Sequence, residues 1–83
     1  MKRVAIIGII IKGERSKAQV VNQILSDYAD MVIGRMGVPD RTNNIYAISI
    51  VVEGSNEEIS ALTGKLGRIE NVNVKTAMTA VEI

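Results

Sequence analysis

The chain has 83 residues, of which 47% are hydrophobic, and its ten basic and nine acidic residues give a formal net charge of +1. This length supports a single domain, and the balanced charge favours neither nucleic acid nor an anionic membrane as a partner. The sequence contains no cysteine and no histidine, which excludes disulfides, thiolate catalysis and metal sites built on thiolates or imidazoles. We therefore expect no metal and no cofactor.

The first predicted element is a strand over residues 4–11, in which every residue is apolar or glycine. A half-exposed strand would alternate, so this run should be buried on both faces. It is short and rich in β-branched residues, and no small-residue cleavage site follows, so a strand fits better than a secretory signal. No stretch reaches the roughly 18 apolar residues of a membrane span. We expect a soluble cytoplasmic protein without a membrane partner.

A helix should follow, because Ser16 and Gln19 have the spacing of a capping box. It is predicted to start at about Lys17 and to end between Asp27 and Asp30. Apolar residues recur at helical spacing along it. These are Val20, Val21, Ile24, Leu25 and Tyr28.

A hairpin is predicted next. Residues 31–38 have the composition of a second strand, and Pro39 and Asp40 should open a turn that residues 41–44 complete. The second long apolar run, residues 45–52, is then the third strand.

The same pattern repeats in the last third of the chain. Ser55 and Glu58 form a second capping box, which predicts a helix over about 56–66. The closing segment, residues 69–78, has valines alternating with Asn73 and Lys75, which predicts an edge strand with one solvent-exposed face.

The order β-α-β-β-α-β predicts an α+β protein of the ferredoxin-like type, with the sheet order 4-1-3-2 and both helices on one face. The two long apolar runs then lie side by side at the centre, and both faces of the sheet are apolar. One face carries Ile7, Ile9, Ile11, Ile48 and Ile50, and the other carries Val4, Ile6, Gly8, Ile10, Ala47, Ser49 and Val51. The sequence does not say which face the helices cover, although the small residues of the second set would suit a close contact between sheets. Because the uncovered face would be an extended apolar patch, we expect self-association.

This arrangement resembles the ACT-type ligand-sensing domains and the related C-terminal domain of nickel-responsive repressors. Three segments are more specific: I-G-R-M-G-V-P at 33–39, L-T-G-K-L-G at 62–67 and R-V-A-I-I-G-I at 3–9. Together they resemble a small family of regulators associated with the iron-only hydrogenase system. The resemblance covers nearly the whole chain and implies an ACT-like, non-enzymatic regulatory domain that forms a dimer or tetramer and binds a small effector or a partner protein at a subunit interface.

The chain departs from the nickel repressors in two respects. Those repressors hold their metal with histidines and a cysteine, which are absent here. The chain also lacks their N-terminal DNA-binding arm, so direct transcriptional repression would require a partner protein.

Two places are candidate ligand or interface sites. Gly13 and Ser16 flank a predicted helix N-terminus, where free amides favour anions and where ACT-type domains often bind an effector. A plain connection between strand and helix explains the same residues.

The second place is residues 34–37, Gly34, Arg35, Met36 and Gly37. Here the Arg35 guanidinium could hold a ligand carboxylate or phosphate, while the glycines permit close approach of the backbone. Alternatively, Arg35 pairs with a carboxylate across a subunit boundary and the glycines mark a bulge.

Other functions on this fold fit less well. An acylphosphatase-like enzyme needs a loop arginine and a positioning asparagine; Arg15 is the sole loop candidate, and Asn43 and Asn44 lie in the wrong connection. An RNA-recognition module stacks bases on aromatic residues of its sheet, but this chain has no Phe or Trp and only two tyrosines. A purely structural assembly domain stays open as an alternative.

Overall fold

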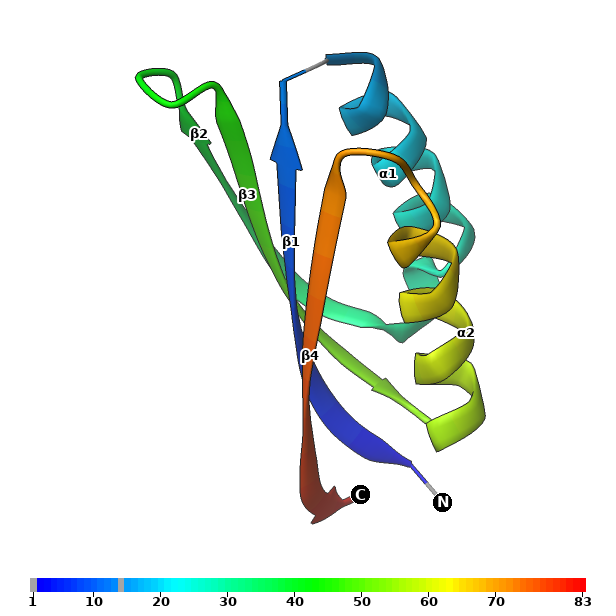
Figure 1. The fold of residues 1–83 in the computed structure, drawn as a ribbon. Helices are drawn as coiled ribbons and strands as arrows, with labels where there is room; N and C mark the ends of the chain where they lie inside the picture. Colours follow the sequence, from blue (N-terminus) through cyan, green and yellow to red (C-terminus); the bar gives the residue numbers. More distant parts are fainter. Residues whose placement is uncertain (1, 14) are drawn as a thin grey trace.

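A computed structural model describes residues 2–13 and 15–83 of the chain. The elements are β1 (Arg3–Lys12), α1 (Arg15–Asp27), a short 3-10 helix η1 (Ala29–Met31), β2 (Val32–Asp40), β3 (Ile45–Gly54), α2 (Asn56–Gly67) and β4 (Val72–Glu82). The strands form one antiparallel sheet in the order β2-β3-β1-β4. Both helices lie on the same side of this sheet (Figure 1). Lys2 and Ile83 lie close together, since the Ile83 amide donates to the Lys2 carbonyl at 3.0 Å. The predicted α+β, ferredoxin-like architecture and its strand order are confirmed.

The core lies between the helices and one face of the two central strands. Ile7, Ile9, Ile48 and Ile50 are at most 2% exposed there. The helices contribute the facing residues Val21, Leu25, Ile59, Leu62 and Leu66, all buried. Because side chains alternate along a strand, the neighbours of these isoleucines must point to the opposite face.

The predicted capping box of α2 is present. The Glu58 amide donates to Ser55 Oγ at 3.1 Å, and the Ser55 amide donates to Glu58 Oε1 at 2.9 Å. The bond from the Ser55 amide lowers the pKa of the Glu58 carboxyl below its ordinary value. This reciprocal pair satisfies two amides that the first turn of a helix leaves without partners.

The start of α1 differs from the prediction. The helix begins at Arg15, so Ser16 lies inside the first turn and not ahead of it. Gly13 takes a φ of 92° directly after β1, in the left-handed region that glycine adopts without strain. Val20 was predicted to belong to the buried stripe, but it is 45% exposed. The 100° turn per residue that buries Val21 leaves Val20 on the flank of the helix.

The hairpin is longer than predicted. Pro39 and Asp40 do not open the turn but continue β2, where Pro39 pairs with Tyr46. A proline is compatible with this position because β2 is an edge strand, in which alternate N–H groups point away from the sheet. Near the other end of β2, the register shifts between Val32 and Gly34, which makes Ile33 the extra residue of a β-bulge.

The closing strand is also displaced from its predicted range of 69–78. It starts at Val72, because the Val72 amide bonds back to the Ile69 carbonyl at 3.2 Å and Asn71 takes a positive φ of 66°. It then continues to Glu82 past an irregularity opposite Val4, where the Thr79 hydroxyl donates to the Val4 carbonyl at 2.6 Å.

Across the described ranges, neither helix combines the length and apolar character needed to cross a membrane.

Candidate functional site

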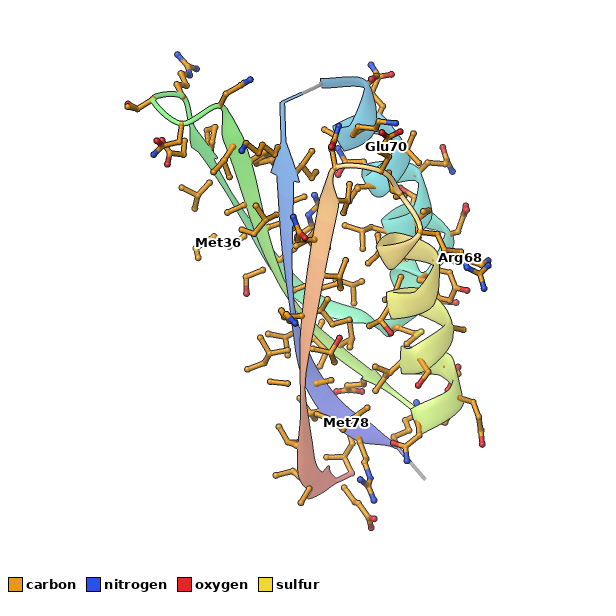
Figure 2. All side chains as sticks on the ribbon, in the orientation of Figure 1. Met36, Arg68, Glu70 and Met78 are labelled. Carbon is orange, nitrogen blue, oxygen red and sulfur yellow. The ribbon has the colours of Figure 1, made fainter. Side chains whose placement is uncertain are left out.

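The face of the sheet opposite the helices is apolar over three of its four strands. We call it the free face. It consists of Val4, Ile6, Gly8 and Ile10 of β1, Ala47, Ser49 and Val51 of β3, and Gly34, Met36 and Val38 of β2. Met36 is 63% exposed and Ile6 47%, and Figure 2 shows Met36 pointing away from the sheet on the side without helices. The face rich in small residues is therefore the uncovered one.

Strand pairing arranges the free face in rows that run across the sheet. The central row contains Met36, Ser49, Gly8 and Lys75. On one side of it lies the row Val38, Ala47, Ile10 and Asn73, and on the other side lies the row Gly34, Val51, Ile6 and Ala77. Apart from Ser49, the polar residues of these rows, Lys75 and Asn73, lie on β4, at the edge of the sheet beside the free face.

Two glycines of the free face have open space above them. A Cβ added at Gly8 would meet only the Lys75 carbonyl oxygen, at 3.9 Å, and one added at Gly34 would meet nothing within 4 Å. Gly37 is different, since a Cβ there would lie 3.0 Å from Cε1 and Cζ of Tyr46 and would contact its hydroxyl. Packing within the subunit therefore explains Gly37 but neither Gly8 nor Gly34.

A hollow of about 470 Å³ lies at the end of the sheet, on the side of the helices. We call it the end hollow. Gly13, the Ala18–Gln19 turn of α1 and the end of the β2–β3 hairpin, including Asp40, Asn44 and Tyr46, line it. The Gly13 amide donates to the Asn44 carbonyl at 3.0 Å, which ties the loop after β1 to the hairpin. The volume is within the range of small-molecule sites.

Asp40 holds the turn beside this hollow. It accepts a bond from the Asn43 side-chain amide at 2.9 Å and one from the Asn43 backbone at 3.2 Å. The side-chain bond is the main reason that the pKa of the Asp40 carboxyl is lowered from its ordinary value. Asp40 therefore contributes a fixed negative charge at neutral pH.

The predicted site residues do not form one cluster. Gly13 lines the end hollow, and Ser16 lies three residues further on, in the first turn of α1. Within residues 34–37, alternation along β2 places Gly34 and Met36 on the free face, while Arg35 and Gly37 pair with Ile50 and Ile48 of the core face. The contiguous motif is thus divided between the two faces of the sheet.

Arg35 has a partner inside the subunit. Its Nη2 donates to Oδ1 of Asn22 on α1 at 2.8 Å. A shallow cavity of about 280 Å³ lies beside it, lined by Leu25, Ser26, Ala29 and Val32. The predicted bulge next to Arg35 is present, one residue before Gly34. A ligand or intersubunit role for the arginine stays a prediction.

Sequence reasoning missed the end hollow, because it forms only when the hairpin tip and the start of α1 meet. Tyr46 and Gln19 both line it, and neither was a candidate. Arg15, the one loop candidate of an acylphosphatase-like site, begins α1, and its side chain lies outside what the structure describes. In the described part of the chain, no three acidic, histidine or cysteine residues gather into a group that could hold a metal ion.

Comparison with known proteins gives a family and a fold. The model of the TM1266-like family, whose description is "Iron-only hydrogenase system regulator, putative", matches residues 3–76. No curated protein matches the chain significantly. Among solved structures, the uncharacterized protein TM1266 from Thermotoga maritima is 35% identical with a TM-score of 0.91, over 94% of this chain and 98% of that one.

Two ACT domains are more distant. The ACT domain of GTP pyrophosphokinase from Chlorobium tepidum is 15% identical with a TM-score of 0.76, over 93% of this chain and 100% of that one. An ACT domain protein from Streptococcus pneumoniae is 14% identical with a TM-score of 0.57, over 92% of this chain and 89% of that one. At such identities, the likeness shows an ACT-like fold and nothing more.

Proposed function

The chain belongs to the TM1266-like family of iron-only hydrogenase system regulators, and from that premise we propose that it is a non-enzymatic regulatory module that self-associates through its free face. The family and the ACT-like fold both support a regulatory role. The proposal adds the surface that joins the subunits and the place where a small effector binds.

The observation that carries the proposal is the apolar character of the free face. Ile6, Ile10, Met36 and Val38 are each between 38% and 63% exposed and lie on β1 and β2, the two strands that flank β3. A soluble monomer rarely exposes a contiguous apolar patch larger than a few hundred Å². Covering this face with a second subunit removes that patch from water.

An enzyme of the acylphosphatase type has less support. Its positioning asparagine would have to present a free amide, but the Asn43 side chain donates to Asp40 within the hairpin turn. Asn44 takes a positive φ of 54° in the same turn. Both residues thus have structural roles where they stand.

We place the effector in the end hollow, which contains the predicted Gly13. A crystal structure of protein purified without added ligand tests this assignment. We expect density for a co-purified small molecule between Gly13 and Tyr46. An end hollow filled by side chains of a neighbouring subunit would instead favour the purely structural assembly domain.

Self-association is tested by replacing Ile6 with lysine. Size-exclusion chromatography with light scattering should give a mass of at least two subunits for the wild type and of one subunit for Ile6→Lys, because removing a lysine charge from water in an apolar contact is costly. Val20→Lys is the matched control, since Val20 is 45% exposed, against 47% for Ile6, but lies on α1. A wild type that is monomeric at micromolar concentration contradicts the proposal, as does equal dissociation of both variants.

A further inference from the structure

The free face presents large and small side chains in an arrangement that is complementary to itself. We propose that two copies pack free face to free face about a two-fold axis that runs along β3 at Ser49, so that Met36 of each copy packs over Gly8 of the partner subunit, where no side chain stands above the strand. This register rests on the proposed self-association and specifies its geometry.

The first observation concerns Gly8. It lies in a central strand, where a glycine weakens the sheet, and its φ is not in the left-handed region. An added Cβ would meet only one atom within 4 Å. Nothing within the subunit requires a glycine at this position, so the close approach of another chain is the remaining physical reason for it.

The second observation concerns Met36. At 63%, it is the most exposed of the large hydrophobic residues within the described part of the chain. It occupies the same row as Gly8, with only Ser49 between them. A methionine side chain is long and unbranched, which suits the filling of an irregular gap.

The symmetry follows from these positions. A rotation of 180° about an axis along β3 exchanges the positions of β2 and β1, so Met36 faces Gly8 of the partner subunit. The same operation places Ile6 over the partner's Gly34, the second glycine with open space above it. Ala47, Ser49 and Val51 then lie near the axis. Such an interface is isologous, because each contact occurs twice.

Other axes fit this surface less well. An axis across the strands would set Met36 against Met36 and leave Gly8 opposite Gly8, which combines a clash with a void. An axis between β1 and β3 would place Gly8 over Ser49 and bury Lys75 under Met36. The axis along β3 leaves Asn73 and Lys75 of β4 at the solvent-exposed rim of the interface, where polar residues normally lie.

The contact area is sufficient but small. Three strands about 4.8 Å apart, each with about ten residues at 3.4 Å rise, present roughly 500 Å² per copy, so the pair buries about 1,000 Å². This is the lower limit for a specific interface.

Glu53 of the two copies would also lie on the axis, at one end of β3, so two negative side chains would face each other there. At that end, the twist of the packed sheets carries the strands apart. We therefore expect a reversible dimer.

The test exchanges the two residues of the predicted contact. Gly8→Met and Met36→Gly alone should each raise the dimer dissociation constant at least tenfold in sedimentation experiments, the first by a clash and the second by a void. The double variant Gly8→Met/Met36→Gly should return to within threefold of the wild type, because the pair is reciprocal. A dimeric wild type without recovery in the double variant overturns this register but leaves the proposed self-association intact. A monomeric wild type overturns both and assigns the free face to another partner.

A second measurement does not depend on the folding of those variants. The chain has no cysteine, so Ser49→Cys introduces a single thiol, which the two-fold axis brings opposite its counterpart across sheets about 10 Å apart. A short bismaleimide should then join two copies of Ser49→Cys. Ser60→Cys, exposed on α2, is the control and should stay uncrosslinked. Equal crosslinking of both variants, or none of Ser49→Cys in a dimeric protein, overturns the register.

Discussion

Replacing Ile9 with alanine is expected to reduce the free energy of unfolding by about 2–5 kcal/mol. The Ile9 side chain has no exposed surface and lies on β1 between Ile48 of β3 and Val74 of β4. Its truncation removes apolar contact and leaves a cavity that a tightly packed core closes only in part. A domain of this length has a total stability of roughly 4–12 kcal/mol, so the variant should lose much of it.

The matched control is the next residue. Ile10 has the same side chain on the same strand but points to the free face and is 38% exposed. Urea unfolding at a protein concentration where subunits are separate should give a clearly smaller loss for Ile10→Ala than for Ile9→Ala. Equal losses would mean that both faces of β1 are covered within one subunit, contrary to the fold described above.

Replacing Gly37 with alanine is expected to destabilise the protein by about 1–3 kcal/mol, the usual cost of overpacking. The new Cβ would lie 3.0 Å from Cε1 and Cζ of Tyr46 and would also contact the hydroxyl. Tyr46 is half-buried and lies on the adjacent strand, opposite Pro39, so its ring must move for the methyl group to fit. Thermal unfolding of the separated subunits measures the effect.

Gly34→Ala is the control, because Gly34 lies on the same strand with nothing within 4 Å of an added Cβ. We expect its unfolding free energy to stay within about 0.5 kcal/mol of the wild type. Tyr46→Ala combined with Gly37→Ala should recover part of the loss in a double-mutant cycle, since the two sites share one contact. Strictly additive losses would show that the tyrosine ring is not the cause.

The strand order could be predicted because two unusually apolar runs must lie at the centre of a small sheet and because helical spacing of apolar residues marks both helices between the strands. The capping box at Ser55 and Glu58 is local chemistry, so sequence spacing was enough to find it. The end of β2 was wrong because Pro39 normally marks a turn, and only its position on an open sheet edge makes it compatible with a strand.

The candidate site was predicted less well, for a geometric reason. Residues 34–37 form one motif in the chain, but a strand alternates its side chains, so Met36 reaches the free face while Arg35 reaches Asn22 on the helix side. Of the end hollow the sequence indicated only Gly13, because Gln19 and Tyr46, which also line it, come from separate elements that meet only in the folded chain.

The sequence by itself determined that this protein has a doubly apolar central sheet, two helices, the second with its capping box, and no thiol or imidazole chemistry, since these properties follow from composition and short-range spacing. Only the tertiary structure decided which face of that sheet is free. Alternation assigns Ile9 and Ile10 to opposite faces, but both are isoleucines, so hydrophobicity alone cannot rank them. The packing of both helices over Ile7 and Ile9 makes the choice, and it leaves Gly8 and Met36 on the open side.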